Sequence, residues 1–165
     1  MLELLKLYFK AYGPATIKDA AWWSGTSPGR VQEVMRELHK EIIACKVEGF
    51  EAIFYCHAET FEQLVAMRVL RDDAVVFLAH EDSSLKAYYE SRKRYVDIKH
   101  YHLLFNSIGE ARASIVINGM VVGIWWQDCS GAIRWKTFSR LSSHHQSAIA
   151  AQSRLLERAI VEYAS

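Results

Sequence analysis

One stretch of the chain decides the fold: residues 13–38 read GPATIKDAAWWSGTSPGRVQEVMREL. Thr16 is a good N-cap for a first helix, and Gly25 is suited to end that helix. Ser27 can cap a second helix with Pro28 at its first position, where proline is favoured. Two short helices around a tight turn predict a helix-turn-helix.

The sequence on either side extends this motif. The residues before it place apolar side chains on one face of a further helix. After residue 41 two runs rich in branched and aromatic residues, 42–47 and 50–56, are joined at Glu48-Gly49, which favours a hairpin. Three helices followed by a hairpin predict a winged-helix domain over residues 1–58.

The rest of the chain predicts a second domain behind a connecting helix. Residues 59–73 have a helical spacing of apolar side chains and form the predicted connection. The second domain is expected over residues 74–165. It starts with a short apolar strand at 74–79 and a polar helix at 82–94, and residues 95–110 are expected to be largely irregular.

An antiparallel meander is the clearest pattern of this second domain. Asn118-Gly119 is the strongest short hairpin signal and lies between expected strands at 114–117 and 120–126. Gly131 turns the chain into a third strand at 132–138. The meander can pack one face and leave the other in water.

The last predicted helix completes the fold. Ser143 and Gln146 have the spacing of a capping box, and the helix is expected to run to about Tyr163. We therefore predict an α+β protein, in which an N-terminal winged helix and a connecting helix precede an antiparallel sheet with a long terminal helix.

Composition limits the classes of function. The 165 residues carry a net charge of +1, which argues against a strongly basic protein that coats nucleic acid. No apolar run reaches the roughly 18 residues needed to cross a bilayer, and the N-terminus does not resemble a signal peptide, so we expect a cytoplasmic protein with no membrane partner. The three cysteines are far apart and predict neither a disulfide framework nor a cysteine zinc site.

Three motifs resemble, in the same order, those of one protein family. They are GPAT at 13–16 with AWWSG at 21–25, DSSLKAY at 82–88, and IVINGMVVGIW at 115–125. In these motifs the chain resembles the AlkZ-like (YcaQ-like) winged-helix family of bacterial DNA glycosylases. The resemblance implies a winged-helix architecture and double-stranded DNA as the partner.

The resemblance does not carry a catalytic residue with it. Family members are longer, contain several winged-helix units, and use a Gln-x-Gln or Gln-x-Asp pair in an earlier part, while this chain resembles their C-terminal part. The glutamines here stand in other contexts: Gln32, Gln63, Gln127, Gln146 and Gln152. We therefore expect a DNA-binding protein without base-excision activity by itself. The alternatives are a glycosylase fragment that needs a missing N-terminal part, and a protein-interaction module.

Two groups of side chains are candidates for DNA contact. In a helix-turn-helix the N-terminal end of the second helix enters the major groove. The candidates there, with one lysine beside the hairpin turn, are Thr26, Ser27, Arg30, Arg36 and Lys46. Against this hypothesis, Glu33 and Glu37 share the exposed face and would repel phosphate.

The second group lies in the C-terminal domain and mixes cations with aromatic residues. Its members are Arg92, Lys93, Arg94, Arg134, Lys136 and Arg140. Trp125 and Trp126 must point to opposite faces of their strand, and we expect Trp126 to be the more exposed one. The alternatives are that the basic run is a solvated face and that the sheet is packed on both sides.

Metal and catalytic sites are not predicted. His100 and His102, and the adjacent His144 and His145, lack the convergent third and fourth ligands of a zinc site. Asp82 follows Glu81 at the end of a strand, but a helix cap is favoured over a general base there. No glycine-rich phosphate loop or Ser-His-Asp signature is present, so neither a cofactor nor a catalytic residue is assigned.

Overall fold

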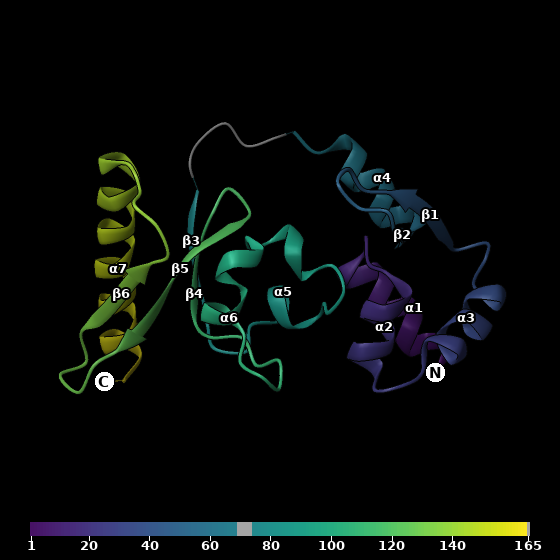
Figure 1. Ribbon diagram of the computed structural model, residues 1–165, viewed down its shortest axis with the longest axis horizontal. Coiled ribbons are helices and arrows are strands. Elements are labelled where there is room, and N and C mark those ends of the chain that lie inside the picture. The colour runs from purple at the N-terminus through teal and green to yellow at the C-terminus, as the bar shows by residue number, and fades with distance from the viewer. Residues whose placement is uncertain (69–73, 165) are drawn as a thin grey trace. The chain divides into compact units, whose positions relative to one another are not determined.

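The structure is a computed structural model that describes residues 1–68 and 74–164 (Figure 1). Residues 69–73, the last part of the predicted connecting helix, lie outside the described residues. Contacts divide the chain into two compact units. Unit 1 comprises Met1–Val69 and Ser83–Arg92, and unit 2 comprises Leu70–Asp82 and Lys93–Ser165. No helix of the described ranges is both long and apolar enough to span a bilayer.

Unit 1 begins with three helices, α1 (Leu2–Tyr12), α2 (Ile17–Ser24) and α3 (Pro28–Glu37). The predicted caps are confirmed. Thr16 and Asp19 form a capping box at the start of α2, and Gly25 ends α2 in the left-handed conformation with φ 67°. Ser27 accepts a hydrogen bond from the Arg30 N–H at the start of α3.

An antiparallel hairpin follows, formed by β1 (Ile42–Lys46) and β2 (Ile53–His57). Its connection spans residues 47–52, so it is longer than the two-residue turn expected at Glu48-Gly49. The hairpin joins the three helices in one core, which includes Leu5, Phe9, Val31 and Phe54. The order of elements is the one expected of a winged helix.

Helix α4 (Ala58–Ala66) starts directly after β2 and packs against β2 and α1. It overlaps the predicted connecting helix over 59–73 but ends at Ala66 and lies within unit 1. Leu64 and Val65 on this helix are exposed.

Ser83–Arg92 returns to unit 1, where it does not form the expected long helix. The prediction of a helix over 82–94 is wrong: α5 spans only Ser83–Lys86, and a 3-10 turn, η1, spans Arg92–Arg94. The reason is the order of the buried side chains, because Leu85, Ala87 and Tyr88 all face the core and do not share a helical face. Hydrogen bonds fix this path, since the Tyr88 hydroxyl donates to the Tyr12 carbonyl and the Tyr8 hydroxyl donates to the Ala87 carbonyl, both over 2.9 Å.

Unit 2 is built on a four-stranded antiparallel sheet in the order β3-β4-β5-β6. The strands are β3 (Val75–Leu78), β4 (Ser114–Ile117), β5 (Met120–Gln127) and β6 (Ile133–Thr137). The hairpin turn at Asn118-Gly119 is confirmed, with φ 51° and 79°. The structure also adds β3 beside β4, a pairing that the sequence pattern did not indicate.

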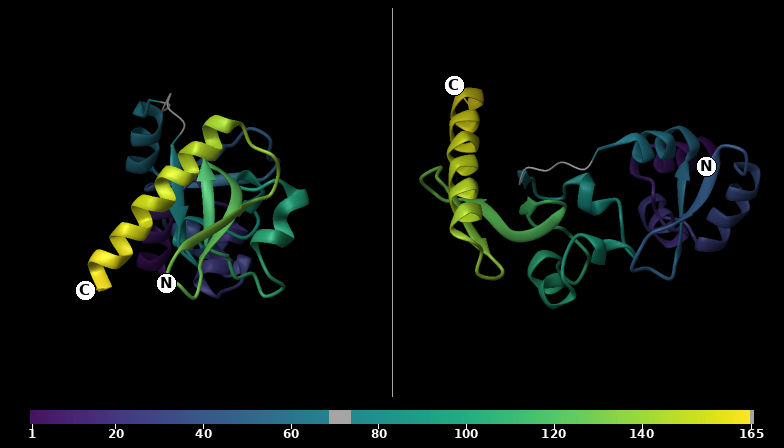
Figure 2. Two further views of the ribbon diagram at one scale, coloured as in Figure 1. Left: turned by 90° about the vertical axis from the view of Figure 1, so that its left-hand side faces the viewer. Right: turned by 90° about the horizontal axis from the view of Figure 1, so that it is seen from above.

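Helix α7 (Ser143–Ala164) covers one face of this sheet and crosses its strands diagonally in the left view of Figure 2. Ile149 of α7 packs with Ile115 and Ile117 of β4, and Trp125 and Trp135 border this cluster. The predicted capping box is wrong by one residue. The Ser142 hydroxyl accepts from the His145 N–H, so Ser142 and not Ser143 caps α7.

Residues 95–110 are more regular than expected. They contain a 3-10 turn, η2 (Ile98–His100), and the short helix α6 (Tyr101–Leu104). Asp97 caps η2 by accepting a hydrogen bond from the Lys99 N–H. Figure 1 shows α6 and α7 on opposite sides of the sheet.

Candidate nucleic-acid interfaces

Helix α3 is buried on one side and exposed to solvent on the other. It is attached to unit 1 through the buried side chains of Val31 and Val34. Ser27, Arg30 and Arg36, all candidates for DNA contact, are exposed. The helix therefore contacts the core along one stripe and leaves its outer side accessible.

The charges on this face are mixed, as the sequence indicates. Arg30 Nη1 lies 2.7 Å from Glu33 Oε2, and both side chains are more than half exposed. Such a pair contributes about 0–1 kcal/mol to stability, so phosphate can compete for Arg30. Arg36 makes no ion pair within the described parts of the chain, and Glu37 beside it is exposed.

The two other candidates of unit 1 differ in accessibility. Thr26 is half-buried in the turn before α3, where its N–H donates to the Ala21 carbonyl. Lys46 is exposed at the end of β1.

In unit 2 the register of β5 and β6 brings three predicted residues together. Trp126 pairs with Arg134, and Ile124 pairs with Lys136. Because paired residues share a face and alternate residues change face, Trp126, Arg134 and Lys136 lie on the side of the sheet away from α7. We call these three residues the β-ribbon surface.

The expected difference between the two strand tryptophans is confirmed. Trp126 is 44% exposed. Trp125 instead packs beside the α7 cluster, donates its indole N–H to the Leu78 carbonyl over 2.8 Å, and lies 5.9 Å from the Phe77 ring. The anchored Trp125 thus fixes the backbone that carries Trp126.

Asp128 organises the turn next to this surface. Its Oδ1 accepts from the Ser130 N–H, the Ser130 hydroxyl and the Ala132 N–H, and its Oδ2 accepts from Arg134 Nε over 2.7 Å. The hydrogen bonds from Ser130 and Arg134 hold the pKa of Asp128 well below its usual range. Asp128 therefore remains charged and positions the Arg134 guanidinium, while one of the five donors of that group is occupied. Arg140 is exposed beyond the end of β6.

The basic run at residues 92–94 does not form one exposed surface. Arg92 is only 1% exposed, which contradicts the accessible position expected for it. Its guanidinium lies 5.2 Å from the Trp22 ring and 5.7 Å from the Tyr89 ring, and its Nε donates to the Tyr88 carbonyl. Lys93 is exposed, and Arg94 is half-buried with its guanidinium 4.8 Å from the Tyr95 ring.

The helix tryptophans of unit 1 are used in packing. Trp23 lies 4.9 Å from Tyr8, ring to ring, and belongs to the aromatic core. Trp22 stacks on Tyr89 at 5.2 Å and donates its indole N–H to the Lys86 carbonyl over 3.3 Å. Both tryptophans therefore serve to hold α2 in unit 1.

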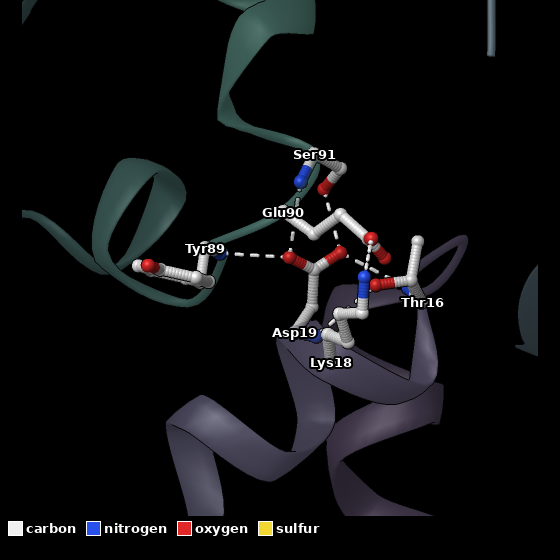
Figure 3. Close-up of polar contacts among 6 residues, drawn as sticks. All are labelled: Thr16, Lys18, Asp19, Tyr89, Glu90 and Ser91. Atoms are coloured by element: carbon white, nitrogen blue, oxygen red, sulfur yellow. Dashed lines mark hydrogen bonds and ion pairs between the residues drawn. The ribbon is translucent and has the colours of Figure 1, made fainter. Parts of the chain in front are cut away.

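Sequence reasoning missed the buried carboxylate that positions α2, shown in Figure 3. Asp19 is fully buried. Its Oδ1 accepts from the Tyr89 N–H over 2.7 Å and the Ser91 N–H over 3.1 Å, and its Oδ2 accepts from the Ser91 hydroxyl over 2.7 Å and the Thr16 N–H over 3.0 Å. We call these contacts the Asp19 clasp.

The Asp19 clasp holds a charge through hydrogen bonds. Burial by itself raises the pKa of Asp19, but the hydrogen bonds from Thr16, Ser91 and Tyr89 outweigh it and lower the pKa below its ordinary value. The N-terminus of α2 also favours a negative charge. The ion pair of the exposed Lys18 and the half-buried Glu90, with Nζ 2.6 Å from Oε1, borders the clasp. The capping-box pattern identified the contact with Thr16, but nothing local in the sequence indicated residues 89–91.

The candidate metal ligands and the carboxylates Glu81 and Asp82 were also placed by the structure. In residues 1–68 and 74–164, no three His, Cys, Asp or Glu side chains converge as metal ligands. Glu81 Oε1 accepts from the Ala111 N–H, and the Glu81 N–H donates to the Ala111 carbonyl, so this carboxylate ties two loops of unit 2 together. Asp82 immediately precedes α5, in agreement with a position at a helix start.

Comparisons with known proteins agree with this description. A family model described as "DNA glycosylase AlkZ-like" matches residues 1–159. The solved structure of Streptomyces sahachiroi DNA glycosylase AlkZ is similar, with a TM-score of 0.74 and 23% sequence identity, over 92% of this chain and 41% of that one. At this identity the likeness establishes the fold, and the chain spans less than half the length of that structure. No curated protein sequence matches the chain.

Proposed function

Because the chain belongs to the AlkZ-like DNA glycosylase family, we propose that it binds double-stranded DNA and does not excise bases by itself. In this proposal residues 1–58 act as a winged helix. Helix α3 docks in the major groove and Lys46, near the β1–β2 connection, contacts the backbone. Lys93, Arg94, Arg140 and the β-ribbon surface supply further contacts from unit 2.

One observation carries the proposal: α3 keeps its outer face exposed at the end of a helix-turn-helix. Ser27 and Arg30 are at the end that enters the groove in this mode of docking, and Arg36 is two turns further along. A hydroxyl and a guanidinium can contact phosphate or base edges. Val31 and Val34 are buried on the opposite side of α3, and their packing keeps the exposed face turned outward.

The proposal that base excision is absent depends on the glutamines. The family's catalytic Gln-x-Gln or Gln-x-Asp pattern has no counterpart among the five glutamines of this sequence. We expect the purified chain to release no base from duplex DNA that carries an alkylated base. Release of the base would overturn this part of the proposal and favour the enzyme.

Salt-dependent binding to duplex DNA tests the main proposal. We expect anisotropy titrations of a labelled duplex to show binding at low salt, with the logarithm of affinity falling by about 0.9 for each phosphate contact per logarithm of salt concentration. Arg36→Ala should weaken binding about three- to tenfold and make this slope shallower by about one contact. Arg154→Ala, which removes an exposed arginine of α7, is the matched control and should change neither quantity.

The opposite result has a clear meaning. If the chain does not bind duplex at low salt, DNA binding is wrong and a protein-interaction module is favoured.

The three cysteines are free thiols, which suits the reducing cytoplasm that we propose as the location of the protein.

A further inference from the structure

We infer that the β-ribbon surface binds an unpaired base of DNA, stacked on Trp126, with Arg134 and Lys136 on the adjoining phosphates. The inference rests on the proposed DNA binding and names the form of DNA that this part of the chain selects. Its support comes from unit 2 alone.

The first support is a rigid aromatic platform. Trp126 is 44% exposed, on a strand that pairs with β6 along its whole second half. The neighbouring Trp125 is locked by its bond to the Leu78 carbonyl and by the cluster beneath α7. An exposed ring on a fixed backbone can stack on a base at a low cost in conformational entropy.

The second support is the charge around the ring. Arg134 lies directly opposite Trp126, and Lys136 is two residues along the same strand, about 7 Å away at the usual rise of a strand. On the other side, the Trp125 N–H donates to the Ala113 carbonyl over 3.1 Å. Arg112, one residue before Ala113, is exposed, and its Nη1 donates to the Leu103 carbonyl over 3.4 Å.

The nearby carboxylate strengthens this surface. The four hydrogen bonds of the Asp128 side chain go to Ser130, Ala132 and Arg134. The carboxylate thus orients the Arg134 guanidinium. Lys136 makes no ion pair within the described ranges. Arg134 and Lys136 therefore place two cations beside the ring, which suits the phosphates of DNA.

An unpaired base fits this arrangement better than an intact duplex. In a duplex the two π-faces of each base are covered by its neighbours, and a ring on a flat strand cannot reach them without unstacking. An unpaired base offers a free face, and aromatic stacking accepts every type of base. The β-ribbon surface is therefore expected to recognise the absence of pairing and not a sequence.

A comparison of three labelled DNAs tests the inference: a matched duplex, the same duplex with a one-base bulge, and the bulged strand alone. We expect the full chain to bind the bulged duplex at least fivefold more tightly than the matched duplex. Trp126→Ala should remove this preference, since stacking on one base is worth roughly five- to one-hundred-fold in affinity. Trp126→Phe should retain much of it, and Tyr163→Ala, which removes the 95% exposed ring of α7, is the matched control.

The outcomes separate the inference from the proposed function. Equal binding of the matched and bulged duplexes, or a preference that persists in Trp126→Ala, would overturn the inference and leave duplex binding intact. Failure to bind any of the three DNAs would overturn both. If Trp126→Ala loses the preference but keeps the circular dichroism and melting curve of the parent, the inference is supported.

Discussion

Helix α3 and the β-ribbon surface carry similar numbers of cationic side chains, but the side chains next to those cations differ. On α3 Arg30 is paired with Glu33, and Arg36 is followed by Glu37. On the β-ribbon surface Arg134 and Lys136 flank an exposed tryptophan, and Arg134 is paired with Asp128 at 2.7 Å. Each surface thus has one paired arginine and one cation without an ion pair in the described ranges, and the strands add an exposed aromatic ring.

The difference follows from the geometry of the two elements. On a helix, residues three and four apart are neighbours. The sequence RVQEVMRE at residues 30–37 therefore places acidic and basic side chains together on the exposed side of α3. On a strand, alternate residues change face, so Ile133 and Trp135 turn toward the buried side while Arg134 and Lys136 stay together on the other. A cluster of like charge is therefore easier to build on the strands.

The strongest way to separate the two regions is to loosen unit 1 alone. Asp19→Ala leaves the N–H groups of Thr16, Tyr89 and Ser91 without their acceptor, and we expect it to lower the free energy of unfolding by about 3 kcal/mol. Binding that depends on Arg36 should weaken, whereas the preference for a bulged duplex should persist. Chemical denaturation and the titrations described above measure both effects.

The control is an equally simple carboxylate in unit 2. Asp97→Ala removes an exposed side chain that caps η2 and pairs with Lys99 at 2.8 Å, and it should cost much less stability. An equal loss in the two variants would contradict the importance of the Asp19 clasp.

Acid should act on the same clasp. The pKa of Asp19 is lower in the folded chain than in the unfolded one, where it is about 3.9, so its contribution to stability is fully present above that value. It is lost as the pH falls through the lower folded pKa. We expect the acid side of a pH–stability profile to be flatter for Asp19→Asn than for the parent, and parallel profiles would contradict this assignment.

A smaller effect is expected when one negative charge is removed from the exposed face of α3. Glu33→Gln removes the partner of Arg30 and one negative charge from α3, so we expect affinity for a matched duplex to rise about two- to fivefold at low salt. The gain should vanish at high salt. The matched control is Glu62→Gln, which removes an exposed carboxylate of α4. Glu157→Gln is less suitable as a control because Glu157 accepts a hydrogen bond from the Ile133 N–H. The same gain in Glu62→Gln would show that only net charge matters.

The smallest expected effect is a change in thiol reactivity. Burial, followed by the charge of Cys45, raises the pKa of Cys56 to about 11, whereas Cys129 is exposed in the turn after β5. We expect a thiol reagent at neutral pH to modify Cys129 first, and a bulged duplex to slow that modification two- to threefold by covering the turn. Mass spectrometry of the labelled chain identifies the site, and Cys56 labelling ahead of Cys129 would contradict the burial.

Much of this comparison was predictable because its causes are local. The caps at Thr16, Gly25 and Ser27 depend on residues within one turn, and the two faces of Trp125 and Trp126 follow from strand alternation. The contact between Asp19 and Ser91 joins positions 72 apart, and no local pattern announces it.

The errors have the same origin. Composition groups Arg92 with its basic neighbours, but its aromatic partners bury it. The short length of α5 follows from the successive burial of Ala87 and Tyr88, which depends on tertiary contacts with α1. Interactions of this kind are encoded in the whole chain and not in a window of it.

The Asp19 clasp has a consequence for how the gene can be divided. The polypeptide leaves unit 1, enters unit 2, returns for Ser83–Arg92 and leaves again. A single cut between residues 68 and 74 would separate Asp19 from the backbone groups of residues 89–91 that hold it. The two units are therefore expected to be inherited, duplicated and transplanted together, and a minimal unit 1 would need residues 83–92 joined back to it.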